Sequence, residues 1–236
     1  MTLVAANVGQ QPVGGGDRGH AEGVAAAFLA GSHFTMQHAG AAELSSPTVM
    51  ALDPLLRNLL FTDGTVTRAL EAQTLCRVKV EVAEQSQTPL PIHATPYLEV
   101  SEGVECLRRR VTMSTGSSTP IVWAESHILT ERLPTGFVEL IDRTPNGIGG
   151  SIERAGLESR RELLWFRLGV TPHWASVDSS SASALIRLYR IITKGRPALL
   201  ICEAFAIEGE SGVYRPLGWS NAAACAANGS TGGSSE

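Results

Sequence analysis

The sequence predicts an α+β fold built on an antiparallel sheet, and three observations support this class. Two pairs of apolar segments, one within 185–207 and one within 104–129, are each joined by a short turn that contains glycine. Such pairs are typical of β-hairpins. The third observation is an amphipathic helical segment after Asp53. We therefore expect two similar hairpins in one antiparallel sheet, accompanied by short helices.

The hairpin at 185–207 contains a carboxylate on an otherwise apolar strand face. Its two runs flank the turn Thr193-Lys194-Gly195-Arg196-Pro197. Side chains alternate between the faces of a strand, so one face carries Leu199, Ile201, Glu203, Phe205 and Ile207. Burying an ionised carboxylate is costly, so Glu203 needs a cation, a hydrogen-bond network, protonation or a ligand. A position at a sheet edge, or a purely structural ion pair, is the simpler alternative.

The second hairpin comprises Val104–Ser114 and Ile121–Leu129. By alternation, one face of its first strand carries Leu107, Arg109, Val111 and Met113, and one face of its second strand carries Ile121, Trp123, Glu125, His127 and Leu129. Arg109 is thus a cation on an apolar face, whereas Arg108 and Arg110 point the other way and are expected to be solvated. A structural ion pair between Arg109 and Glu125 is the alternative to a ligand site.

The rest of the folded region is expected to alternate short helices, strands and loops. Asp53 as N-cap and Pro54 as first residue begin a helix with an apolar stripe. The other expected elements are a helix at Val66–Ala72, a half-buried strand at Leu75–Gln85, a proline-rich loop at 89–96, a helix from Leu133 to about Ile141, a flexible backbone-exposing loop at Asn146–Ser151, and a partly helical segment at Ile152–Leu168.

Composition divides the 236 residues into an arm, a domain and a tail. Residues 1–45 are rich in Gly and Ala and are expected to be a flexible arm, 46–220 form the folded domain, and 221–236 are expected to be a disordered tail. No CxxC or other metal-ligand spacing relates the four cysteines, so free thiols in a reducing compartment are expected.

The overall charge narrows the classes of partner. A net charge of -4 and a pI near 5.9 argue against broad nucleic-acid binding and give no reason to expect a membrane surface. No apolar run reaches the roughly 18 residues that span a bilayer. We expect a cytoplasmic protein with a small-molecule partner, either a monomer or a homodimer.

Several familiar catalytic motifs are missing from the sequence. It has no P-loop, and GIGGS lacks the strand and helix context of a dinucleotide site. The six histidines show no metal-ligand spacing, so neither a metal nor a cofactor is expected. Ser126 and His127 point to opposite strand faces, which excludes them as a nucleophile and base pair. An inward arginine, an inward glutamate and a glycine-rich loop remain, and together they suit a small organic anion.

The ordered segments LLFTDGTVTRALEA, LRRRVTM, VWAESHILTERLP, NGIGGS and ITKGRPALLICEAF resemble the chorismate pyruvate-lyase family, especially its actinobacterial-type branch. The resemblance covers about 55–207. It implies a six-stranded antiparallel sheet with helices on one side and helical flaps over a buried site. The implied reaction is elimination of pyruvate from chorismate, which leaves 4-hydroxybenzoate and needs no metal or cofactor.

The resemblance also assigns roles to five residues. The carboxylate-binding arginine of the family falls on Arg109, and the glutamate that hydrogen-bonds the ring hydroxyl falls on Glu203. Backbone N–H contacts fall on Val66 and on Ile148 with Gly149. Glu203, if protonated in an apolar setting, could also assist departure of the enolpyruvyl oxygen.

Two other functions stay open at this point. The same fold family includes effector domains of bacterial transcription regulators, which bind small ligands without catalysis. Those regulators carry a winged helix-turn-helix upstream, and the glycine-rich residues 1–45 are too short to form one. A related enzyme that converts chorismate to another hydroxybenzoate is the second alternative.

Overall fold

The computed structural model describes residues 37–38, 46–115, 119–144, 147–172, 174, 182–210 and 212–219. The expected arm, apart from its short strand at 37–38, and the expected tail lie outside these residues.

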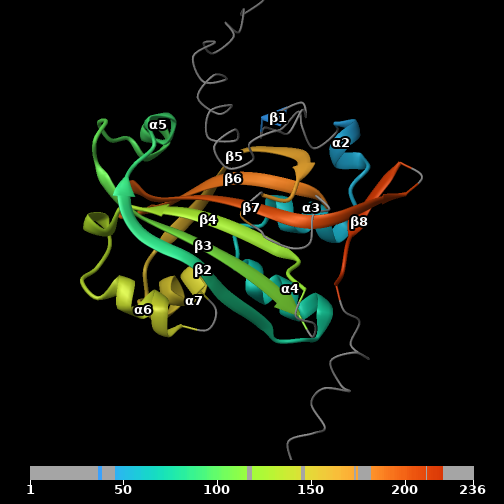
Figure 1. Ribbon diagram of the computed structural model, residues 1–236, viewed down its shortest axis with the longest axis horizontal. Helices are drawn as coiled ribbons and strands as arrows, with labels where there is room; N and C mark the ends of the chain where they lie inside the picture. Colours follow the sequence, from blue (N-terminus) through green and yellow to red (C-terminus); the bar gives the residue numbers. More distant parts are fainter. Residues whose placement is uncertain are drawn as a thin grey trace, which may run out of the picture.

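Six long strands form one antiparallel sheet in the order β5-β6-β7-β4-β3-β2 (Figure 1). Two short strands extend it, since β1 pairs with β5 and β8 pairs with the end of β7. The strands are β1 (Gln37–His38), β2 (Val78–Pro89), β3 (Glu105–Thr115), β4 (Val122–Ile128), β5 (Ser159–Val170), β6 (Ser183–Thr193), β7 (Arg196–Glu210) and β8 (Val213–Pro216). The prediction of a single antiparallel sheet of about six strands is confirmed.

Both predicted hairpins are present. β6 and β7 are joined by Lys194 and Gly195, which have φ angles of 50° and 75°. Two positive φ angles in a two-residue loop match the twist of the flanking strands. β2 continues beyond the predicted end at Gln85 and includes Pro89. It is the last strand in the order of the sheet, paired with β3 on one side. A proline there can face away from the ladder without losing a strand hydrogen bond.

The helices are α2 (Pro47–Met50), α3 (Pro54–Phe61), α4 (Val66–Thr74), α5 (Thr95–Leu98), α6 (Phe137–Arg143) and α7 (Gly147–Arg154), with 3-10 turns at Ile92–Ala94 and Thr130–Arg132. The Asp53 carboxylate accepts a hydrogen bond from the Leu55 amide at 2.9 Å, so the predicted start of α3 is confirmed. The predicted helix at Leu133 begins four residues later, at Phe137.

Helices α3, α4, α6 and α7 pack on one face of the sheet, and Val49 of the short helix α2 belongs to the same apolar cluster as α3 and α4. Figure 1 shows α4, α6 and α7 along the lower edge of the view. Apolar residues of α3 and α4, such as Leu59 and Leu70, pack with Phe205 of β7. Phe137 and Ile141 of α6 pack with the opposite end of the same sheet face. The two apolar clusters leave space between them, where the pocket lies. The single turn α5 packs on the other face.

Two predictions in the middle of the chain are wrong. The sequence predicts a loop at Asn146–Ser151, but residues 147–151 begin helix α7, whose Ile152 is buried against α6 and the sheet, and Asn146 lies outside the described residues. Tertiary packing, rather than intrinsic propensity, stabilises such a glycine-rich helix. The expected partly helical segment at Ile152–Leu168 is mostly strand β5. A bulge between Leu163 and Trp165 interrupts the alternation that marks a strand in the sequence.

Within the described part of the chain, no helix is both long and apolar enough to cross a membrane. Cys106 and Cys202 are free and buried, as expected. Cys76 is disulfide-bonded, so the expectation of four free thiols is wrong for that residue.

Candidate active site

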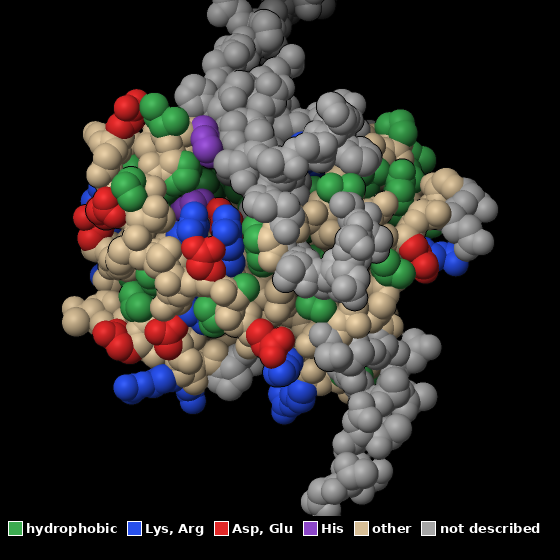
Figure 2. Space-filling model, viewed as in Figure 1, with side chains coloured by type: hydrophobic (Ala, Val, Ile, Leu, Met, Phe, Trp, Pro, Cys, Tyr) green, Lys and Arg blue, Asp and Glu red, His purple; other side chains and the backbone are tan. Residues whose placement is uncertain are grey.

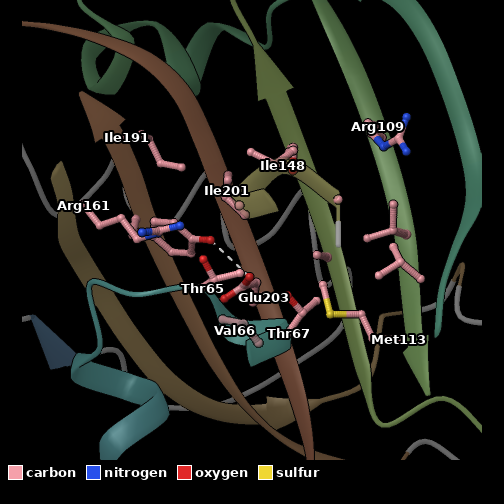
Figure 3. Close-up of a pocket in the computed structure, with 17 residues that line it drawn as sticks. Thr65, Val66, Thr67, Arg109, Met113, Ile148, Arg161, Ile191, Ile201 and Glu203 are labelled. Atoms are coloured by element: carbon pink, nitrogen blue, oxygen red, sulfur yellow. Dashed lines mark hydrogen bonds between the residues drawn. The ribbon is translucent and has the colours of Figure 1, made fainter. Parts of the chain in front are cut away.

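A pocket lies between the sheet and the first turns of α4 and α7, which we call the flap helices (Figure 3). All five residues that the sequence singled out line it: Val66, Arg109, Ile148, Gly149 and Glu203. The other lining residues are Thr65, Thr67, Val80, Val111, Met113, Ala124, Ser126, Gly147, Arg161, Tyr189, Ile191 and Ile201. The structure therefore brings together residues that are up to 138 positions apart in the chain.

Glu203 lies on β7 with 3% of its surface exposed, directly opposite Arg187 of β6. Arg187 Nε and Nη2 both lie 2.8 Å from Glu203 Oε2, and the Tyr189 hydroxyl donates to Oε1 at 3.1 Å. The face that seemed apolar from β7 alone thus carries a cation from β6. Glu203 therefore belongs to a buried ion pair and also lines the pocket.

Arg187 connects this carboxylate to the end of α3. Its Nη1 donates to the carbonyl oxygens of Leu59, Leu60 and Thr62. The last carbonyls of a helix have no partner within the helix, so the guanidinium satisfies groups that would otherwise be buried unpaired. Arg187 therefore has a structural role in addition to its pairing with Glu203.

Tyr189 keeps its proton beside the carboxylate. Burial and the adjacent Glu203 carboxylate raise the pKa of the Tyr189 hydroxyl well above its usual range, so the phenol stays a hydrogen-bond donor. Each carboxylate oxygen has two acceptor positions. Glu203 can therefore accept a further hydrogen bond from a ligand in the pocket.

Arg109 is buried on β3, in line with Ser126 of β4. Its Nη1 donates to Asp142 Oδ1 of α6 at 2.6 Å and to Gln85 Oε1 of β2. The alternative of an Arg109–Glu125 ion pair is wrong, because Glu125 is the cross-strand partner of Arg110 on the opposite sheet face. The salt-bridge distance from Arg110 Nε to Glu125 Oε2 is 2.6 Å.

The opposite sheet face carries its own charged cluster, and this corrects the expectation of solvated arginines. Arg108 and Arg110 are only 29% and 16% exposed at their side chains, and both pair with Glu84. Figure 2 shows blue and red side chains grouped beside a histidine on this face. Burial opposes ionisation of Glu125, but hydrogen bonds from His127 and Arg110 outweigh it and lower the pKa of Glu125. The sheet separates this cluster from the pocket.

The backbone donors of the pocket come from helix starts instead of a flexible loop. Val66 is the first residue of α4, and Ile148 and Gly149 lie in the first turn of α7. The first N–H groups of a helix have no acceptor within the helix, and the helix dipole favours an anion beside them. The two flap helices thus direct positive ends toward the same space.

The flap helices also touch each other closely. Glu153 of α7 forms a salt bridge of 2.9 Å with Arg68 and accepts a hydrogen bond from Thr65 Oγ1 at 3.4 Å. A Cβ atom on Gly149 would lie 2.6 Å from Thr65 Cγ2, too close for any real contact. A Cβ at 149 would force the Thr65 side chain or one of the helices to shift, so glycine allows the two helix starts to pack this closely.

Replacing Gly149 by alanine is expected to weaken binding of 4-hydroxybenzoate, the product that the family resemblance implies, by roughly tenfold, since overpacking of this kind costs about 1–3 kcal/mol. This loss would occur although alanine favours helix formation. Titration of the purified variant with 4-hydroxybenzoate measures it. Adding Thr65→Ser removes the clashing methyl group and should restore most of the affinity. Unchanged affinity in the single variant would contradict this role of glycine.

The sequence missed several polar residues of the pocket. Arg161 belongs to the segment expected to be partly helical, so alternation could not place it. Thr67 is buried on α4, and its hydroxyl has no hydrogen-bond partner in the described structure. Alternation placed Ser126 on the strand face opposite His127 but gave no sign that it lines a pocket. The pairing of Arg187 with Glu203 has no signal in the sequence, because it depends on a register shift between Ile191 and Ile192 of the β6–β7 hairpin.

Arg109 and Glu203 lie two strands and two residues apart on one sheet face. With strands about 4.8 Å apart and a rise of about 3.4 Å per residue, their Cα atoms lie roughly 12 Å apart. Two side chains and one ring can span this distance. The pocket thus has a cation at one end and a carboxylate at the other, an arrangement that suits a small organic anion with a polar group at its far end.

Comparison with known proteins identifies the family. Residues 60–211 match the model of the family described as chorismate pyruvate-lyase Rv2949c-like, and the chain belongs to this family. A protein of Mycobacterium tuberculosis (strain CDC 1551 / Oshkosh) named chorismate pyruvate-lyase is 26% identical over 168 residues, which are 69% of this chain and 84% of that protein. A Mycobacterium leprae protein of the same name is 28% identical over 167 residues, 69% of this chain and 79% of that one.

Solved structures share the fold at low sequence identity. The effector domain of PhnF from Mycobacterium smegmatis is 12% identical, with a TM-score of 0.50 over 61% of this chain and 88% of that domain. A structure of PhnF from the same organism gives a TM-score of 0.51 at 12% identity, over 62% of this chain and 65% of that chain. At this identity the similarity concerns the fold alone.

Proposed function

We propose that the protein is a chorismate lyase that eliminates pyruvate from chorismate and leaves 4-hydroxybenzoate. The observation that carries the proposal is the pocket itself, with Arg109 and Glu203 separated across one sheet face. A 4-hydroxybenzoate molecule presents a carboxylate and a hydroxyl at opposite ends of a ring, which matches this separation. The names of the mycobacterial relatives support the same reaction.

Each pocket group has a role in this proposal. Arg109 and the backbone N–H groups of Val66, Ile148 and Gly149 hold the ring carboxylate, because charge-assisted hydrogen bonds from a guanidinium suit a carboxylate. Glu203 accepts a hydrogen bond from the C4 hydroxyl of the ring. Arg187 and Tyr189 hold the Glu203 carboxylate in position.

The reaction breaks the bond from ring C3 to the enolpyruvyl oxygen and removes the proton on C4, while the departing enolpyruvate takes up a proton and becomes pyruvate. Because Glu203 is paired with Arg187, we assign it the role of a hydrogen-bond acceptor, in place of the proton donor that an apolar setting suggested. Formation of an aromatic ring drives the elimination. Orientation of the substrate in a water-excluding pocket then supplies much of the rate enhancement.

The test is incubation of the purified protein with chorismate, with and without a metal chelator, followed by chromatography of pyruvate and 4-hydroxybenzoate. Equal amounts of both products, unaffected by the chelator, are expected. Pyruvate with another hydroxybenzoate would overturn the regiochemistry.

The second candidate is an effector-type domain, which the fold shared with PhnF favours. Tight binding of 4-hydroxybenzoate without turnover of chorismate would select it. A cytoplasmic location, and a monomeric or homodimeric state, stay predictions.

A further inference from the structure

A second arginine, Arg161 of β5, lines the pocket on the side opposite Arg109. Figure 3 shows Arg161 and Arg109 on opposite sides, with Glu203 between them. Arg161 is the cross-strand partner of Ile191 in β6, so it belongs to the same sheet face as Arg109 and Glu203. The pocket is thus lined by two cations and one carboxylate.

The charged residues of the pocket differ in how they are paired. Arg109 is paired with Asp142, and Glu203 is paired with Arg187. Among the described residues, no carboxylate lies within 4.0 Å of the Arg161 guanidinium, whose Nη1 donates to the backbone oxygen of Asp63. Its Nε is buried without a hydrogen-bond partner. A guanidinium that lines the pocket without a carboxylate partner is available to bind a ligand anion by charge-assisted hydrogen bonds.

The proposed substrate carries a group that matches this cation. Chorismate is a dianion, with one carboxylate on ring C1 and a second on the enolpyruvyl group at C3. C3 is adjacent to C4, the carbon whose hydroxyl is assigned to Glu203. With the ring carboxylate on Arg109, the second carboxylate therefore lies at the Glu203 end of the pocket, where Arg161 is found.

We propose that Arg161 binds the enolpyruvyl carboxylate of chorismate, an inference that rests on the lyase function proposed above. Arg161 then distinguishes the substrate from the product, because 4-hydroxybenzoate lacks this carboxylate. It holds the leaving group while Arg109 and Glu203 hold the ring, so the bond that breaks lies between two anchored parts. Loss of this group on elimination leaves the product with fewer contacts than the substrate.

A purely structural role for Arg161 makes a different prediction. Its hydrogen bond to Asp63 supports the connection between α3 and the flap helix α4. If this were its only role, replacing it would displace Thr65 and Val66. Binding of substrate and product would then weaken alike.

The test compares Arg161→Gln and Arg161→Lys with the wild-type protein and with Arg160→Gln. Arg160 is a matched control, because it is the adjacent residue, its side chain is 68% exposed, it does not line the pocket, and it forms a salt bridge of 3.7 Å with Glu162. For each protein, kcat/KM for chorismate and Kd for 4-hydroxybenzoate are measured.

For Arg161→Gln, we expect kcat/KM for chorismate to fall by about tenfold to a hundredfold, the range for one lost charge-assisted hydrogen bond. The Kd of 4-hydroxybenzoate should stay within about twofold of the wild-type value. Arg161→Lys keeps the charge but not the fork of donors, so its kcat/KM for chorismate should lie between those of the wild type and Arg161→Gln. Arg160→Gln should behave as the wild type.

Equal losses of chorismate turnover and 4-hydroxybenzoate affinity, or no loss of either, would overturn the assignment of Arg161. Failure of the lyase proposal gives a separate result. A wild-type protein that binds chorismate without converting it overturns the reaction, and direct titration of chorismate then still tests Arg161. A wild-type protein that does not bind chorismate overturns both proposals.

Discussion

Replacing Glu203 by glutamine is expected to lower kcat for chorismate by at least about a hundredfold, the scale of loss when one preorganised hydrogen-bonding group of an active site is removed. The amide keeps the shape of the side chain but loses the negative charge that accepts the hydrogen bond of the C4 hydroxyl. Initial rates of pyruvate release measure the effect. Circular dichroism and thermal unfolding show whether the variant is folded.

The buried ion pair makes a control necessary, because Glu203→Gln leaves the Arg187 guanidinium without its carboxylate. Removing one partner of such a pair lowers the free energy of unfolding by about 3–5 kcal/mol, whereas replacing both charged residues often leaves it unchanged. The double variant Arg187→Met with Glu203→Gln removes the unpaired charge but leaves the Leu59, Leu60 and Thr62 carbonyls without their donor, so it should regain only part of the lost thermal stability. Its turnover should stay low. If turnover recovers together with stability, Glu203 is a structural residue only.

Replacing Arg109 by glutamine is expected to raise the Kd of 4-hydroxybenzoate by about tenfold to a hundredfold, since the carboxylate loses its charge-assisted hydrogen bonds. The cost in stability should be small for a buried arginine, because its partner Asp142 is 47% exposed and can be solvated. Isothermal titration with 4-hydroxybenzoate measures the change.

Arg108 is the matched control for Arg109. Arg108 directly precedes Arg109 in β3, pairs with Glu84, and lies on the opposite sheet face. Arg108→Gln should leave the Kd within about twofold of the wild-type value. An Arg109→Gln variant with unchanged affinity would assign the ring carboxylate to the helix N–H groups alone.

The sequence by itself determined the features that depend on local periodicity and turn chemistry. The two hairpins, the start of α3 at Asp53, and the inward faces of Arg109 and Glu203 all follow from alternation and capping. The family resemblance added Val66, Ile148 and Gly149, which line the same pocket. These predictions hold because neighbouring residues along the chain set side-chain direction in a strand and satisfy the first amides of a helix.

Only the tertiary structure decided what surrounds those residues. Counting back from the two-residue turn of the β6–β7 hairpin pairs Arg187 with Cys202, but a bulge between Ile191 and Ile192 moves it opposite Glu203. A second bulge in β5 obscures the strand that places Arg161 in the pocket. α7 forms where its sequence suggested a loop, because Ile152 packs on α6 and the sheet. Bulges and packed helices depend on partners distant in the chain, so no local pattern reveals them.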